Sequence, residues 1–212
     1  MAVYDLEEQE QIDEIKAWWK QYRSLVVLVV AAAAVTVSGI QGWRYHENKQ
    51  GLEAGELYAQ LQAAVGGNET RKVQDIAAVI TDKYARTGYA AYAALAAAKA
   101  AFDGGDLATA KARLQWVADK GRDDATRDIA RLRLVAVLLD EKQYDDALKL
   151  VDTQHMESLS ALYADLKGDV LVAQGKVEEA RAAYQRALDK SEAKSTYRAL
   201  IQLKRDALGA PK

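Results

Sequence analysis

The residues best suited to chemistry are few in this chain. It contains two histidines, His46 and His155, which lie far apart, and no cysteine. Neither histidine belongs to a zinc-type spacing or a His-Glu-x-x-His pattern. The lack of cysteine excludes disulfides, thiol catalysis and cysteine–zinc sites. We therefore expect neither a metal site nor any other cofactor.

Two glycine pairs are the only segments that resemble phosphate-binding loops. Gly66-Gly67 and Gly104-Gly105 follow helical rather than strand patterns, and neither precedes the Gly-Lys-Ser/Thr sequence that cradles phosphate. They are interpreted as turns, so the protein is not expected to be an enzyme.

The charge is balanced, with 29 basic and 31 acidic side chains and a formal net charge of −2. No basic stripe with interleaved aromatic residues occurs, so nucleic acid is not an expected partner.

An uncharged apolar run covers residues 24–43, between Arg23 and Arg44. As a helix rising about 1.5 Å per residue, it would reach roughly 30 Å, the thickness of the hydrocarbon core of a bilayer. Aromatic residues at both ends suit the membrane interfaces: Trp18, Trp19, Tyr22, Trp43 and Tyr45. The run predicts a single transmembrane helix. A cleaved signal peptide and a buried core helix are the alternatives.

The basic residues that flank the run predict its orientation. Lys16, Lys20 and Arg23 precede it, whereas Arg44 and Lys49 follow it. The excess favours a cytoplasmic N-terminus, because basic flanks stay inside. Residues 1–23 then form an acidic cytoplasmic head, for which disorder is the default expectation, and residues 44–212 form a periplasmic domain.

The rest of the chain is alanine-rich and has a single proline, Pro211, which predicts an all-α fold. Turn residues divide it into four helical hairpins and a last helix. The expected helices are 52–65 and 70–85, 89–102 and 107–119, 127–139 and 144–151, 158–174 and 177–190, and 195–208.

Three hairpins share a template: a turn residue, a polar residue, an apolar residue, two spacers and an alanine. The alanines are Ala110, Ala147 and Ala180, which lie 37 and 33 residues apart. This spacing brackets the tetratricopeptide period of about 34 residues. We predict a tetratricopeptide-repeat-like solenoid with a C-terminal capping helix. Its first hairpin is expected to be degenerate, and a non-repeating bundle is the alternative.

The order of these features resembles the YfgM-type ancillary subunits of the bacterial Sec translocon. The similarity includes Trp18-Trp19, Gly42-Trp43-Arg44 and the segment from Asp165 to Gly175. It implies a single-pass protein of the bacterial inner membrane that associates with the translocon channel subunits. It also implies contact with translocating polypeptides and with a membrane-anchored periplasmic chaperone of the prolyl-isomerase type. A membrane-anchored scaffold or regulator of another envelope complex is the alternative function.

Two surfaces are candidates for binding. The first is the concave face of the array, lined by the first helix of each repeat, which would suit an extended segment or an amphipathic helix. Its residues are Tyr92, Leu95, Lys99, Phe102, Ile129, Leu132, Leu139, Leu162, Asp165, Asp169 and Val172. The alternative is that these residues form the core.

The second surface lies in the apolar run. Ala34, Ser38 and Gly42 recur every four residues, a stripe of small side chains that lets another transmembrane helix approach closely. The alternative is that small residues merely fill the span.

Overall fold

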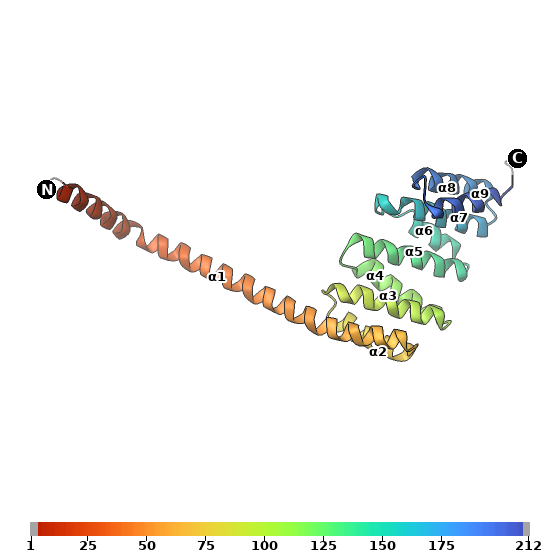
Figure 1. Cartoon of the computed structure of the whole chain (residues 1–212), viewed down its shortest axis with the longest axis horizontal. Coiled ribbons are helices and arrows are strands. Elements are labelled where there is room, and N and C mark those ends of the chain that lie inside the picture. Colours follow the sequence, from red (N-terminus) through yellow and green to blue (C-terminus); the bar gives the residue numbers. More distant parts are fainter. Residues whose placement is uncertain (1–3, 210–212) are drawn as a thin grey trace. The chain divides into compact units, whose positions relative to one another are not determined.

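The computed structural model describes residues 4–209, with side chains from residue 11 onward, so the ends of the expected head and repeat domain lie outside the described residues. The described residues are helical and contain no strand (Figure 1). The helices are α1 (Tyr4–Gly66), α2 (Thr70–Lys83), α3 (Gly88–Asp103), α4 (Leu107–Lys120), α5 (Asp124–Asp140), α6 (Tyr144–Val151), α7 (Ser160–Ala173), α8 (Val177–Lys190) and α9 (Thr196–Asp206), with a short 3₁₀ turn, η1 (Glu157–Leu159), before α7.

The chain forms two compact units, which divide between Lys49 and Gln50 within α1. The first unit consists of the N-terminal part of α1. Helix α1 is already formed at Tyr4, so the expectation of a disordered head is wrong for the described residues. Long charged residues favour helix, which accounts for this difference.

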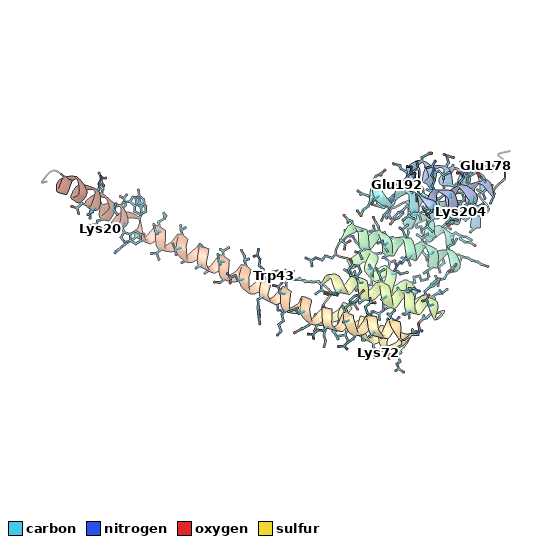
Figure 2. All side chains as sticks on the ribbon, viewed as in Figure 1. Lys20, Trp43, Lys72, Glu178, Glu192 and Lys204 are labelled. Carbon is cyan, nitrogen blue, oxygen red and sulfur yellow. The ribbon has the colours of Figure 1, made fainter. Side chains whose placement is uncertain are left out.

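The apolar run lies in the first unit. Within the described residues, α1 provides a helix that is long and apolar enough to cross a membrane. None of its most apolar stretch is buried, and large side chains such as Leu28 and Val35 are exposed. The alternative of a core helix is therefore wrong. The aromatic residues at the ends are exposed as well, including Trp43, which is labelled in Figure 2.

The second unit stacks helical hairpins, with the last part of α1 and α2 at one end and α8 and α9 at the other (Figure 1). Three turns contain the turn residue of the template. In each of them this residue has a left-handed backbone: Gly105 (φ 80°), Lys142 (φ 60°) and Gly175 (φ 76°). The next amide donates a hydrogen bond back to the carbonyl five residues earlier, for example from Gln143 to Leu138 (2.8 Å). This arrangement, the Schellman motif, satisfies carbonyls at the end of the helix.

The first hairpin follows the same plan, although the sequence suggested that it is degenerate. Asn68 has φ 55°, and the amide of Glu69 donates to the carbonyl of Ala64 at 2.9 Å. Val73 stands where later hairpins have alanine, and it is fully buried. Asparagine and valine stand where the template has a glycine turn residue and an alanine. The first hairpin therefore does not match the template in sequence, although its backbone follows the same repeat.

Another correction concerns the start of α5, expected at Arg127 and found at Asp124. Asp123 caps this helix by accepting hydrogen bonds from the amide of Thr126 (2.8 Å) and from its hydroxyl (2.6 Å). An N-cap aspartate satisfies amides that have no partner within the helix, so the helix extends back to it.

Within a hairpin, small residues permit the close approach of the two helices. Ala110, Ala147 and Ala180 are completely buried. A Cβ at Gly168 of α7 would collide with the ring of Tyr184 on α8. Three apolar clusters then join the hairpins in series, and Trp116 of α4 packs against both the first and the second. Each hairpin thus buries its apolar face against its neighbours.

The turn at Lys142 generates a prediction. A side chain in the left-handed region costs about 1–2 kcal/mol, which glycine avoids. We expect Lys142→Gly to stabilise the protein by about 1 kcal/mol and Gly175→Ala to destabilise it by a similar amount. Thermal unfolding followed by circular dichroism measures both. If the two substitutions shift the melting temperature in the same direction, this interpretation of the turns is wrong.

Candidate functional site: the inner face of the repeats

The predicted concave-face residues differ in exposure. Tyr92, Lys99, Phe102, Ile129 and Val172 are exposed. Leu132, Leu139, Leu162 and Asp169 are half-buried, and Leu132 and Leu139 pack against the largest apolar cluster. Leu95 and Asp165 are instead buried, which agrees with the alternative that such residues belong to the core. The part of this face that remains accessible therefore lies mainly on α3 and α5.

A buried polar network joins α5 to α7. Asp128 of α5 is only 2% exposed, and its carboxylate accepts hydrogen bonds from the amide of Met156 (2.8 Å) and the hydroxyl of Tyr163 (3.2 Å). Arg131 completes the network with an ion pair of 2.8 Å. Burial, together with the negative charge of Asp128, raises the pKa of Tyr163. The tyrosine therefore stays protonated and acts as a donor.

A second network holds the capping helix α9 on α7. Lys204 of α9, labelled in Figure 2, forms ion pairs with Asp165 and Asp169 of α7, both at 2.8 Å. Asp165 also accepts a hydrogen bond from Tyr197 (2.7 Å), and Asp169 accepts one from Tyr184 (2.7 Å). These five residues, the α9 clamp, account for why Asp165 and Asp169 do not line an open surface.

The carboxylates of the α9 clamp favour the protonated forms of its lysine and of Tyr197. Burial lowers the pKa of Lys204, but the two carboxylates outweigh it and leave that pKa raised. Burial and the hydrogen bond to Asp165 raise the pKa of Tyr197. The clamp therefore holds a protonated lysine and a protonated tyrosine at neutral pH.

An apolar crevice of about 360 Å³ opens between α3 and α5. Its floor is made by buried side chains of three helices, Ala98, Leu114 and Val137. Phe102 and Ala136 form its walls, and Lys99, Asp103 and Arg133 stand at its rim. The repeat register predicts Lys99 and Phe102 on this face but not Arg133, because it selects one stripe of each helix.

A cluster of tyrosines lies near the start of α3, whereas the crevice is lined by residues near the end of that helix. The ring of Tyr58, from α1, lies 5.4 Å from that of Tyr89 and 6.5 Å from that of Tyr92. Tyr89 and Tyr92 are exposed. Of these three tyrosines, the repeat register predicts only Tyr92 on the concave face. The contact of Tyr58 with the other two joins residues some thirty positions apart in sequence, so a local pattern does not reveal it.

The remaining candidates lie elsewhere. Ala34, Ser38 and Gly42 are exposed on α1, and nothing lies within 4 Å of a Cβ added at Gly42. His155 lies in the loop between α6 and η1, where its ring stacks on Tyr163 at 4.0 Å. Among residues 11–209, no group of three potential metal ligands gathers.

An exposed apolar helix followed by stacked helical hairpins defines the class, a tetratricopeptide-repeat-like protein with a helix that fits a single-pass membrane anchor. The family model described as "Tetratricopeptide repeat-like domain" matches residues 16–210. No solved structure matches the chain.

Curated relatives narrow the class. The chain is 33% identical to the ancillary SecYEG translocon subunit of Neisseria gonorrhoeae over 96% of its own length and 98% of the relative's. It is 32% identical to that of Haemophilus influenzae, covering 87% and 90% of the two chains, and 30% identical to that of Escherichia coli, covering 96% and 97%. The chain belongs to the family of ancillary SecYEG translocon subunits.

The α9 clamp generates a prediction. Lys204→Met leaves two carboxylates at the inner face without their cation, so we expect it to destabilise the protein by about 3 kcal/mol. Lys72→Met is the matched control. Lys72 pairs with Glu69 at 3.3 Å on an exposed surface, and such pairs contribute about 0–1 kcal/mol. Chemical denaturation measures both variants.

The pH dependence separates charge from packing. Because the fold raises the pKa of Lys204, its contribution is fully present below pH 10.5, the ordinary value, and is lost as pH rises through the raised value. The difference between wild type and Lys204→Met should therefore shrink in alkaline solution. A difference that stays constant across this range means that packing, rather than charge, holds α9.

Proposed function

We propose that this protein is a non-enzymatic ancillary subunit of the bacterial Sec translocon, anchored in the inner membrane by α1. The single observation that carries the proposal is the similarity to relatives named as ancillary SecYEG translocon subunits over nearly the whole chain. Because the match covers 96% of this chain, it includes the apolar helix as well as the repeats. A repeat array with a partly apolar inner face supports a role in protein–protein contact.

The finer proposal concerns what the repeats contact. With an N-terminus in the cytoplasm, as the excess of basic residues before the span favours, the repeats lie in the periplasm. There they would meet translocating polypeptides and a membrane-anchored chaperone of the prolyl-isomerase type, and they would couple the channel to periplasmic chaperones. The support for this chaperone is the family resemblance of the sequence.

Orientation has a direct test, because the chain has no native cysteine. Single cysteines at Gln11 and Glu192 occupy exposed positions before and after the span. In intact spheroplasts, we expect a membrane-impermeant maleimide to label Glu192→Cys and to leave Gln11→Cys unlabelled until the cells are lysed. The opposite pattern places the repeats in the cytoplasm and overturns the periplasmic role.

Partner choice is tested by co-purification from mild detergent. We expect the full chain to retain translocon channel subunits, and Ser38→Leu to lose them if the small stripe is a packing face. Ala33→Leu is the matched control, because it makes a similar enlargement on a different side of α1 at about 100° per residue.

Three outcomes are informative. Loss in Ser38→Leu alone supports recognition through the stripe, whereas retention in both variants moves recognition to the repeats. Purification of another envelope complex without translocon subunits favours the alternative, a membrane-anchored scaffold or regulator, and overturns the proposal.

A further inference from the structure

The inner helices are the first helices of the repeats, which include α3, α5 and α7, together with the capping helix α9. Along this series, each helix is linked to the next by the same kind of polar contact, with one exception. Asp128 of α5 accepts a hydrogen bond from Tyr163 of α7, and Asp165 of α7 accepts one from Tyr197 of α9. In each case a tyrosine of the next inner helix closes the junction with the previous one.

The exception is the junction of α3 and α5. Helix α3 has no aspartate before its last residue, Asp103, and α5 has no tyrosine. In the described part of the chain, no hydrogen bond or ion pair joins these two helices. The apolar crevice lies at this junction, so among the three junctions from α3 to α9 the one without an aspartate–tyrosine contact is the one that holds the crevice.

The size of the crevice limits what enters it. A volume of about 360 Å³ lies at the lower end of the range for ligand pockets, about 300–1,000 Å³. A whole helix, about 10–12 Å across with its side chains, has too large a volume to enter it. One or two side chains of an extended segment fit instead. The buried floor of Ala98, Leu114 and Val137 requires that the entering group be apolar.

The rim gives the crevice a charge. Lys99 and Asp103 neutralise each other through an ion pair of 2.6 Å. Arg133 forms no hydrogen bond or ion pair with any described residue, and its neighbours at helical spacing are Ile129, Ala130, Ala136 and Val137. An exposed guanidinium beside an apolar floor suits a ligand carboxylate, which it can bind through two parallel hydrogen bonds.

We propose that the crevice between α3 and α5 binds an extended segment of another polypeptide, one that carries a bulky apolar side chain next to an acidic residue. The apolar group occupies the crevice over Leu114, and the carboxylate pairs with Arg133. The inference rests on the proposed function, because it names the class of polypeptide segment that the inner face binds in the periplasm.

Fluorescence polarisation with the purified full chain in detergent tests the proposal. The probe is a fluorescein-labelled peptide, Ser-Gly-Ser-Glu-Phe-Leu-Ser-Gly-Ser, and two counterparts replace its glutamate by lysine or its phenylalanine by alanine. We expect the wild type to bind the first peptide at least about fivefold more tightly than either counterpart. Lysine in place of glutamate exchanges an attraction to Arg133 for a repulsion, and alanine in place of phenylalanine removes the apolar group that fills the crevice.

Two variants locate the site. Arg133→Glu should weaken binding of the glutamate peptide about tenfold or more and improve binding of the lysine peptide. Ala136→Leu, at an exposed position, should fill the crevice and weaken binding of both. Arg186→Glu on α8 is the matched control, because it makes the same change of charge at an exposed residue away from the crevice and should bind as wild type does. Circular dichroism verifies that each variant is folded.

Several outcomes would contradict the proposal, and each has a different meaning. Equal weakening by Arg133→Glu and Arg186→Glu shows unspecific attraction and overturns the proposal. So does a wild type that prefers the lysine peptide, or an Ala136→Leu variant that binds normally. A dimer that dissociates in Arg133→Glu while no peptide binds assigns the crevice to a second copy of the chain. Because the assay contains no translocon, its failure leaves the Sec association untouched, and a failed co-purification leaves peptide binding untouched.

Discussion

The stacking of hairpins that cannot bury their own apolar faces is the constraint on which the repeat array depends. Two features make the stacking possible. A left-handed residue at each turn, such as Gly105 or Lys142, reverses the chain within a few positions. Fully buried small residues, such as Ala147 and Ala180, then let the paired helices pack closely. The apolar clusters that result extend from α1 to α9 without depending on a disulfide, a metal ligand set or a long loop.

Polar contacts between successive inner helices determine which parts of the inner face are closed. Asp128 and Asp165 are buried and accept hydrogen bonds from tyrosines of the next inner helix. Asp128 also pairs with Arg131 of its own helix, and Asp165 pairs with Lys204 of α9. Where such a contact is absent, between α3 and α5, the floor stays apolar and accessible. On the inner face, aspartate–tyrosine contacts therefore close the junctions of α5 with α7 and of α7 with α9, whereas a crevice lies between α3 and α5.

The membrane helix and the repeats follow different rules because their surroundings differ. In the apolar run, exposed valine and leucine are compatible with lipid, and the small residues Ala34, Ser38 and Gly42 are the unusual positions. In the repeats, exposed apolar groups such as Tyr92 and Phe102 are the unusual ones. These two sets of residues are the ones through which the proposed partner contacts of the anchor and of the repeats would be made.

The sequence by itself determined the all-α class, the apolar helix and the three repeats that keep glycine or alanine, because helical period and breaker residues are local signals. It missed the first repeat, since Asn68 and Val73 meet the same backbone and packing needs with other side chains. Only the tertiary structure decided which inner-face residues are accessible. Asp165 and Phe102 are both predicted on the concave face, yet Lys204 pairs with the buried Asp165, whereas Phe102 stays exposed. That difference arises from contacts between helices far apart in sequence, which a local pattern does not encode.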